Sequence, residues 1–177
     1  MPEYRLNLLG DYLRKDTVTI GGREYIVCGH LPGGRTMLMT KQFYRSNIKF
    51  DEESPDYKIS SIRTELQSLY EELKNAIGEN NIYKHTVDLT TLNGMKDFGS
   101  CEDYISLPTL DFLRENIDIF MDFKDSVDDW GWLATAWGTE ATGNSYSVCI
   151  VAPDCRIGRG SCNLYHGARA FCVLKSS

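Results

Sequence analysis

The sequence predicts an α+β domain, and three stretches of it carry this prediction. The segments on both sides of Gly21-Gly22 are rich in β-branched and aromatic residues, which is typical of a hairpin. Residues 60–77 place apolar side chains at helical spacing. Residues 130–175 are rich in aromatic and β-branched residues separated by turn residues, which indicates an antiparallel sheet. The 177 residues fit a single domain, with a β-meander and loop at 1–59, a two-helix region at 60–129 and a C-terminal sheet at 130–175.

The N-terminal segment is expected to form three consecutive strands. Thr17–Ile20 is β-branched, the glycine pair supplies a two-residue turn, and Arg23–Gly29 returns as the second strand. A second turn around Pro32 leads into a third strand at Thr36–Thr40. The polar residues from 41 to 57 then indicate a surface loop.

The first predicted helix begins at Ser60 or Ser61, because serine is a good N-cap, and it runs to about Ile77. Its apolar residues follow steps of three and four: Ile62, Leu66, Leu69, Leu73 and Ile77. Gly78 is suited to the C-terminal cap.

The second predicted helix opens at Pro108-Thr109 and reaches Phe120 or a little beyond. Its apolar face consists of Leu110, Leu113, Ile117 and Phe120. Between the two helices we expect a strand at 82–89, a loop at 98–103 and a short strand at 104–107.

Three strands are expected in the C-terminal quarter, at 130–137, at 146–152 and at 167–175. All three tryptophans lie at its head, and buried indoles there would form the nucleus of a core. Trp130 and Trp132 would share one face of the strand and Trp137 the other. Gly158, Gly160 and Gly167 are interpreted as positions of positive φ in a long loop.

The start and the end of this quarter resemble a known pattern. Residues 130–136 read Trp-Gly-Trp-Leu-Ala-Thr-Ala, and residues 167–171 read Gly-Ala-Arg-Ala-Phe. Together they resemble the closing segment of a widespread family of proteins from bacteria, phages and mobile elements. A looser form occurs in C-type lectin-like domains, including formylglycine-generating enzymes. The resemblance implies a C-type lectin-like mixed domain, with structural roles for Trp130, Trp132 and Arg169.

The chain also departs from these relatives. It has none of the Glu-Pro-Asn, Gln-Pro-Asp or Trp-Asn-Asp motifs with which lectins bind Ca²⁺. Cys155 and Cys162 do not match the close pair of reactive cysteines in formylglycine-generating enzymes. The family's proline after the C-terminal arginine is Ala170 here. A calcium-dependent sugar site is therefore not expected.

Acidic residues around the second helix form the clearest candidate binding site. They step by four and three along the chain: Asp111, Glu115, Asp118, Asp122, Asp125 and Asp129. If the helix ran that far, all six carboxylates would line one face. One interpretation is a solvated face opposite the apolar one. The other is a row of charge that imitates a nucleic-acid backbone and binds the groove of a basic enzyme.

Catalytic and metal-binding motifs are not recognisable in the sequence. The six cysteines contain no Cys-x-x-Cys, and they are expected to be thiols, with Cys149 and Cys172 in the core. Cys28 with His30, and Cys162 with His166, have no catalytic signature around them. We therefore expect no catalytic residue, no metal and no cofactor.

The net charge of −6 argues against nonspecific binding to nucleic acid or to an anionic membrane. No apolar run is long enough for a signal peptide or a membrane span, so the cytoplasm of a host cell is the expected location. The functional expectation is a non-enzymatic protein-recognition module of phage or mobile-element type. Its concrete form would be an inhibitor of a host defence nuclease, similar to an anti-CRISPR protein. The alternatives are a carbohydrate- or metal-binding lectin-like protein, a divergent formylglycine-generating-type enzyme and a phage receptor-binding component.

Overall fold

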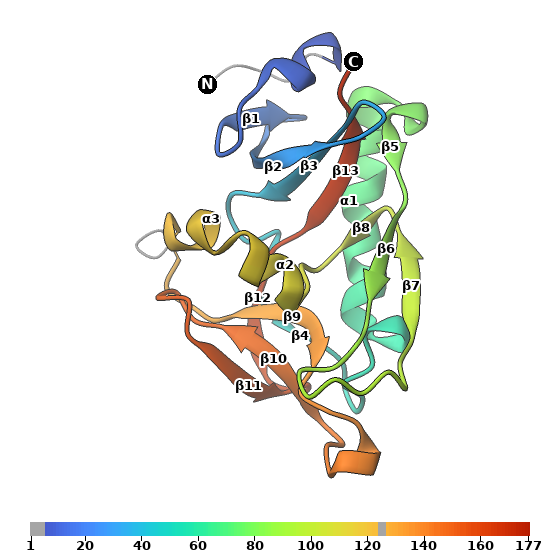
Figure 1. Cartoon of the computed structure of the whole chain (residues 1–177), viewed down its shortest axis with the longest axis vertical. Helices are drawn as coiled ribbons and strands as arrows, with labels where there is room; N and C mark the ends of the chain where they lie inside the picture. The colour runs from blue at the N-terminus through green and yellow to red at the C-terminus, as the bar shows by residue number, and fades with distance from the viewer. Residues whose placement is uncertain (1–5, 124–126) are drawn as a thin grey trace.

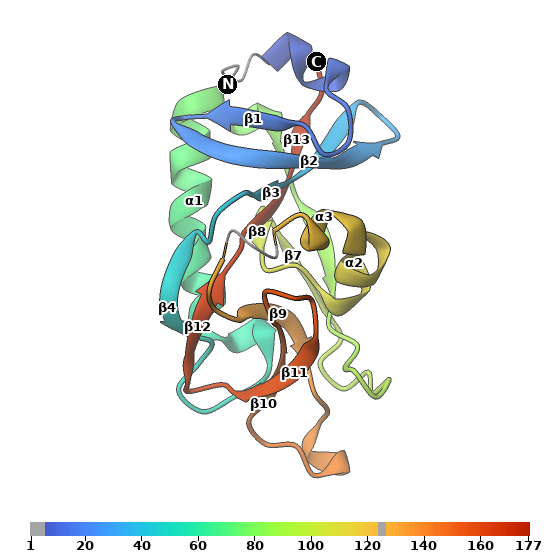
Figure 2. The same ribbon diagram turned by 90° about the vertical axis from the view of Figure 1, so that its left-hand side faces the viewer.

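A computed structural model describes residues 6–123 and 127–177 of the chain. Two larger β-sheets follow one another along the length of the molecule (Figure 1). The long helix α1, Ser61–Ile77, lies on one side of them, and the short helices α2, Leu110–Glu115, and α3, Ile117–Met121, lie on the other (Figure 2). The architecture is α+β, which confirms the predicted fold class.

The first sheet joins the N-terminal meander to the end of the chain. Its central strand is the last one, which pairs antiparallel with β3 on one side and with β5 and β8 on the other. Its strands are β1, Thr17–Ile20; β2, Arg23–Leu31; β3, Arg35–Thr40; β5, Ile82–Tyr83; β8, Ile105–Ser106; and β13, Phe171–Lys175. The predicted meander and both of its turns are confirmed.

The second sheet has the order β11-β10-β9-β12-β4 and contains one parallel pair, β9 with β12. Its strands are β4, Arg45–Lys49; β9, Gly131–Ala136; β10, Ser147–Val151; β11, Ile157–Ser161; and β12, Tyr165–Ala168. The expectation of one C-terminal antiparallel sheet is wrong in two respects. Strand β13 belongs to the first sheet, and β4 enters the second sheet from the segment expected to be a loop.

A separate two-stranded ladder lies beside α1 (Figure 1). It pairs β6, His85–Asp88, with β7, Ser100–Asp103. The sequence pattern at 82–89 is therefore divided between two strands, β5 and β6, and the expected loop at 98–103 contains β7. Four short 3₁₀ helices complete the described elements: Leu6–Asp11, Tyr57–Ile59, Glu79–Asn81 and Glu140–Thr142.

Helix α1 has the bounds that its sequence predicts. The Ser60 hydroxyl accepts a hydrogen bond from the Arg63 backbone N–H at 3.3 Å, and Gly78 ends the helix with φ +86°. The side chains of Ile62, Leu66, Leu69 and Leu73 are fully buried in the larger of two apolar clusters. The smaller cluster fills the space under α2 and α3.

Two of the passages of the chain from one sheet to the other lie next to each other. The first leads from β3 to β4 and the second from β12 to β13. Backbone hydrogen bonds join them, from Thr40 N–H to Ala170 O at 2.9 Å and from Tyr44 N–H to Ala168 O at 2.7 Å. This junction connects the two sheets.

The three glycines expected in a loop instead lie in β11 and β12, and none of them has a positive φ. Glycine is needed there because a side chain has no room. A Cβ on Gly158 would lie 2.8 Å from the Trp130 ring, and one on Gly167 would lie 2.4 Å from the Phe43 ring. The glycines therefore allow aromatic rings to pack directly on the strand backbone.

Candidate functional site

The second predicted helix is interrupted at Asn116. This residue has φ −125° and ψ 31°, which is outside helical geometry, and it separates α2 from α3. Its side-chain amide donates to Phe112 O at 3.0 Å, so the asparagine bonds the backbone of the preceding turn. The expectation of one continuous helix is wrong, and the mid-helix asparagine is the sequence signal that could have shown it.

The interruption separates the predicted acidic row into parts. Asp111 and Glu115 are exposed on α2, Asp118 is on α3, and Asp122 caps the end of α3. Asp125 lies outside the described residues. Asp129 precedes β9, where its carboxylate accepts the Trp130 backbone N–H at 2.7 Å and lies 3.5 Å from the His166 imidazole. The described carboxylates therefore do not share one helical face.

Two cations from the N-terminal segment neutralise part of this surface. The Arg14 guanidinium forms an ion pair with Asp118, including a hydrogen bond of 2.7 Å, and also donates to the Asn116 side chain at 3.0 Å. Lys15 lies 3.6 Å from Asp118 and 3.2 Å from Asp122. The hydrogen bond from Arg14 holds the pKa of Asp118 far below its usual range. No local sequence pattern indicates contacts between groups so far apart in the chain.

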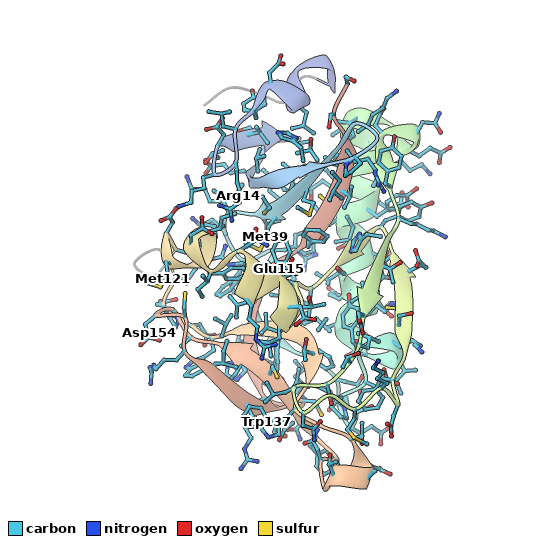
Figure 3. The ribbon with its side chains drawn as sticks, in the orientation of Figure 1. Arg14, Met39, Glu115, Met121, Trp137 and Asp154 are labelled. Carbon is cyan, nitrogen blue, oxygen red and sulfur yellow. The ribbon has the colours of Figure 1, made fainter. Side chains whose placement is uncertain are left out.

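Helix α3 presents apolar side chains to solvent. Ile117, expected in the core, is 42% exposed, and Met121, one turn later, is 44% exposed. After the interruption at Asn116, Ile119 is buried in place of Ile117, whereas Phe120 is buried as predicted. Figure 3 shows Met121 and Arg14 near the same edge of the molecule. We call Ile117 and Met121, together with the carboxylates of Asp111, Glu115, Asp118 and Asp122, the α2–α3 surface.

The three tryptophans have different environments. Trp132 is 1% exposed, donates its indole N–H to Ile48 O at 2.8 Å and packs against Phe50 and His166. Trp130 and Trp137 are half-buried, with a guanidinium over each ring. Trp132 and Trp137 pack in different clusters, as strand alternation predicts, but only Trp132 is a fully buried core residue.

Arg169 lies at the junction between the sheets and is 6% exposed. It donates to Thr40 O at 3.1 Å and to Lys41 O, so it bonds two carbonyls of the β3–β4 passage. Its guanidinium lies 3.9 Å from the centre of the Phe123 ring, and burial lowers its pKa to about 10. This is the geometry that a structural role for Arg169 predicts.

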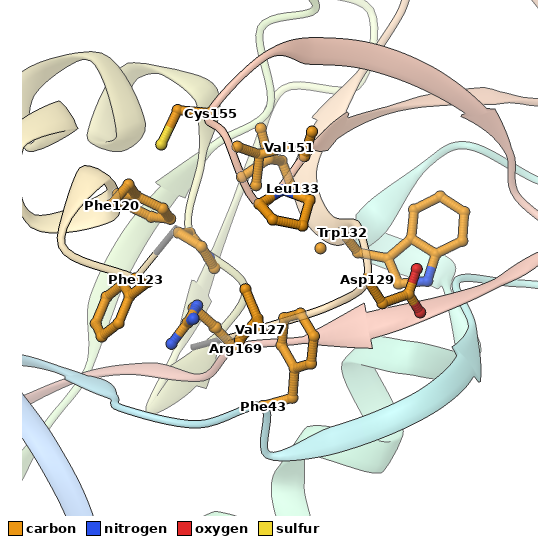
Figure 4. A pocket seen from close by; sticks show the side chains of 14 residues that line it. Phe43, Phe120, Phe123, Val127, Asp129, Trp132, Leu133, Val151, Cys155 and Arg169 are labelled. Carbon is orange, nitrogen blue, oxygen red and sulfur yellow. The ribbon is translucent and has the colours of Figure 1, made fainter. Parts of the chain in front are cut away.

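A small pocket opens beside Arg169 (Figure 4). Its walls are mostly apolar: Phe43 and Phe123 flank the guanidinium, and Phe120 and the Cys155 side chain line the wall further away. The volume available to a water-sized molecule is about 20 Å³, which is enough for about one water. Burial raises the pKa of the Cys155 thiol, so the pocket does not favour a thiolate nucleophile.

The described cysteines and histidines do not converge on a reactive site. The six thiols are unpaired, and Cys149 and Cys172 lie in the core as predicted. His30 bonds the Thr36 hydroxyl and the Tyr12 carbonyl, and His85 bonds the Ser106 hydroxyl. Within residues 6–123 and 127–177, no group of three or more histidine, cysteine and acidic side chains has a geometry that could hold a metal ion.

Comparison of the chain with protein-family models, with curated proteins and with solved structures gives no match. The family resemblance of residues 130–171 therefore stays a prediction. No helix in the described part of the chain has the length and apolar character needed to span a bilayer.

Proposed function

We propose that this chain is a non-enzymatic protein-recognition module that binds its partner through the α2–α3 surface. The observation that carries the proposal is the outward direction of Ile117 and Met121, which are one turn apart on α3 and exposed by 42% and 44%. Two neighbouring apolar side chains surrounded by charges have the composition of a protein interface, in which an apolar centre supplies affinity and a polar rim supplies orientation.

The charges of this surface favour a basic partner, although less strongly than the sequence suggests. Four carboxylates, from Asp111, Glu115, Asp118 and Asp122, face three cations, from Arg14, Lys15 and Arg114. Among the described residues, Glu115 has no cation within ion-pair distance. A basic side chain of a partner is therefore expected to pair first with Glu115. A long imitation of phosphate charges receives less support, because Asp118 and Asp122 already have partners.

The same proposal includes a C-type lectin-like domain and a phage or mobile-element setting. Support for a C-type lectin-like domain comes from Gly131 and Gly167, which lie in the two halves of the resembling motif and pair with each other between β9 and β12. The specific function that we propose for the module is inhibition of a host defence nuclease. Such an enzyme carries a basic groove for nucleic acid, which suits an acidic protein.

The test compares variants of the full chain as baits in a bacterial lysate that contains defence nucleases. The apolar variant is the double substitution Ile117→Ser and Met121→Ser, and its matched control is Leu164→Ser, since Leu164 is 53% exposed in the turn between β11 and β12. The charge variant is Glu115→Gln, and its control is Glu71→Gln on the exposed side of α1. Captured proteins are identified by mass spectrometry after nuclease treatment, and binding of the recovered partner is then measured with purified components.

The proposal expects a partner that the wild-type chain and both controls retain, that the apolar variant loses, and that Glu115→Gln binds several-fold more weakly. Recovery of a nucleic-acid enzyme would support the inhibitor form. Equal capture by the apolar variant and the Leu164→Ser control would contradict the proposed surface. A reactive thiol or a bound metal with enzymatic turnover would contradict the non-enzymatic class.

A further inference from the structure

Strand β11 is an outer strand of the second sheet, and its outer edge is open in Figures 1 and 2. Among the described residues it pairs only with β10, in a regular antiparallel register without a bulge, from Ser147 opposite Ser161 to Val151 opposite Ile157. The opposite edge strand of the same sheet, β4, has an irregular register and a positive φ at Asn47. A regular, unblocked edge can pair with another strand.

The hydrogen bonds at both ends of the β10–β11 ladder show which backbone groups of β11 point outward. Cys162 N–H donates to Tyr146 O at 2.9 Å, and Ala152 N–H donates to Arg156 O at 2.8 Å. Bonded pairs recur at every second residue of an antiparallel ladder, so Gly158 and Gly160 bond β10. The N–H and C=O groups of Ile157 and Arg159 therefore face away from the sheet. No described residue hydrogen-bonds these four groups.

The side chains along this edge also favour a particular occupant. Arg159 and Ile157 point to the same face, and both are exposed, Ile157 by 40%. Arg159 lies over the Trp137 ring at 5.8 Å, and no described carboxylate is within ion-pair distance of it. Arg156, by contrast, already pairs with Asp154 at 2.8 Å. On the other face, Gly158 leaves the half-buried Trp130 ring beside the strand.

We propose that the outer edge of β11 binds an extended peptide segment of a partner protein by strand addition, and that this segment carries an acidic residue opposite Arg159. The backbone groups of Ile157 and Arg159 would form four hydrogen bonds with it in an antiparallel arrangement. The residue two positions after the acidic one lies opposite Ile157 and is apolar. The residue between them lies opposite Gly158, where a ring or a long apolar side chain contacts Trp130.

Charge distinguishes this occupant from a second copy of the chain. Antiparallel pairing of β11 with β11 of another copy places two Arg159 guanidinium groups on the same face, directly opposite or diagonal to each other. Like charges in such positions are destabilising. An acidic segment instead supplies the counter-charge. The surface is separate from the α2–α3 surface and has the opposite charge preference, so the two proposals can fail independently.

The experiment uses a displayed library of random peptides, with the full chain as bait and affinities of the enriched peptides measured by fluorescence anisotropy. Proline has no backbone N–H, so Ile157→Pro removes the hydrogen-bond donor of residue 157. This N–H faces away from β10, so the hydrogen bonds between β10 and β11 remain. Ile157→Val keeps the donor and is the matched control. Arg159→Glu reverses the charge. Size-exclusion chromatography with light scattering reports self-association of the same proteins.

The expected peptides have an acidic residue two positions before an apolar or β-branched one. Ile157→Val should bind them like the wild type, whereas Ile157→Pro should bind about tenfold more weakly through the lost hydrogen bond. Arg159→Glu should select basic peptides instead. The proposal is overturned by a library without acidic enrichment, or by peptides that bind Ile157→Pro and Ile157→Val equally. A wild-type dimer that Ile157→Pro dissociates would also overturn it, because the occupant would then be a second copy.

Discussion

His85 is an imidazole held inside the molecule, between β6 and the first sheet. Its Nε2 bonds the Ser106 hydroxyl at 2.7 Å, its ring packs edge-on against Phe171, and its Nδ1 is buried without a hydrogen-bond partner among the described residues. Burial lowers the pKa of His85 to about 4, although Asp103 and Glu102 act in the opposite direction. The folded state therefore keeps this side chain neutral.

The stability of the protein is predicted to fall as the pH decreases from about 6.5 to about 4. In this window His85 becomes protonated in the unfolded chain, at the ordinary histidine pKa of roughly 6.5, but stays neutral in the folded chain. The difference between the two pKa values corresponds to a loss of about 3 kcal/mol in the free energy of unfolding. Urea unfolding at a series of pH values measures it, with His85→Gln as the comparison.

The variant should lack this part of the pH dependence, whatever its stability at neutral pH. Acidic groups contribute their own losses at low pH in both proteins, so the informative quantity is the difference between the two slopes. Parallel curves for the wild type and His85→Gln would show that His85 is protonated in the folded state as readily as in the unfolded one.

A helix or strand is predicted correctly from the sequence where the residues that determine it lie within the element itself. Helix α1 is predicted almost to the residue, because Ser60, Gly78 and the apolar spacing between them lie within the element itself. Strand β11 is not predicted, because Gly158 and Gly160 interrupt the strand pattern in the sequence. Glycine is required there because the rings of Trp130 and His166, from elsewhere in the chain, pack against the backbone. Strand β4 is missed because its polar residues are stabilised by pairing with β12.

Gly167→Ala is predicted to destabilise the protein by about 1–3 kcal/mol. The backbone of this residue in β12 has no positive φ, so the cost comes from the clash of the new Cβ with the Phe43 ring, 2.4 Å away. Thermal or urea unfolding measures it. The same substitution in a Phe43→Ala background should cost much less, since the ring is then absent. Equal costs in the two backgrounds would indicate a backbone origin instead.

The whole molecule depends on contacts between segments that are distant in the sequence, and for this reason the candidate site was only partly predictable. The acidic residues of α2 and α3 are visible in the sequence, but the cations that neutralise Asp118 come from positions 14 and 15. The side chains of Ile117 and Met121 are exposed because the helix is interrupted at Asn116. The apolar spacing of the sequence fits one continuous helix and does not indicate this interruption. The outward edge of β11 follows from its register with β10, which no local pattern shows.

Arg169 is predicted to hold the two sheets in register. It donates from the β12–β13 passage to the carbonyls of Thr40 and Lys41 in the β3–β4 passage, and its guanidinium packs on Phe123. Arg169→Met removes these donors and leaves two carbonyls without them, so the free energy of unfolding should fall by about 2–4 kcal/mol. Arg114→Met, at an exposed arginine, is the control and should change it by roughly 0.5 kcal/mol or less.

Native-state hydrogen exchange locates the effect of Arg169→Met. The amides of Thr40 and Tyr44 donate across the junction to Ala170 O and Ala168 O, so their protection should decrease more than that of amides inside α1. A uniform decrease would mean that Arg169 contributes only to global stability. A variant as stable as Arg114→Met would show that the backbone hydrogen bonds between the passages suffice, because these bonds remain when the guanidinium is removed.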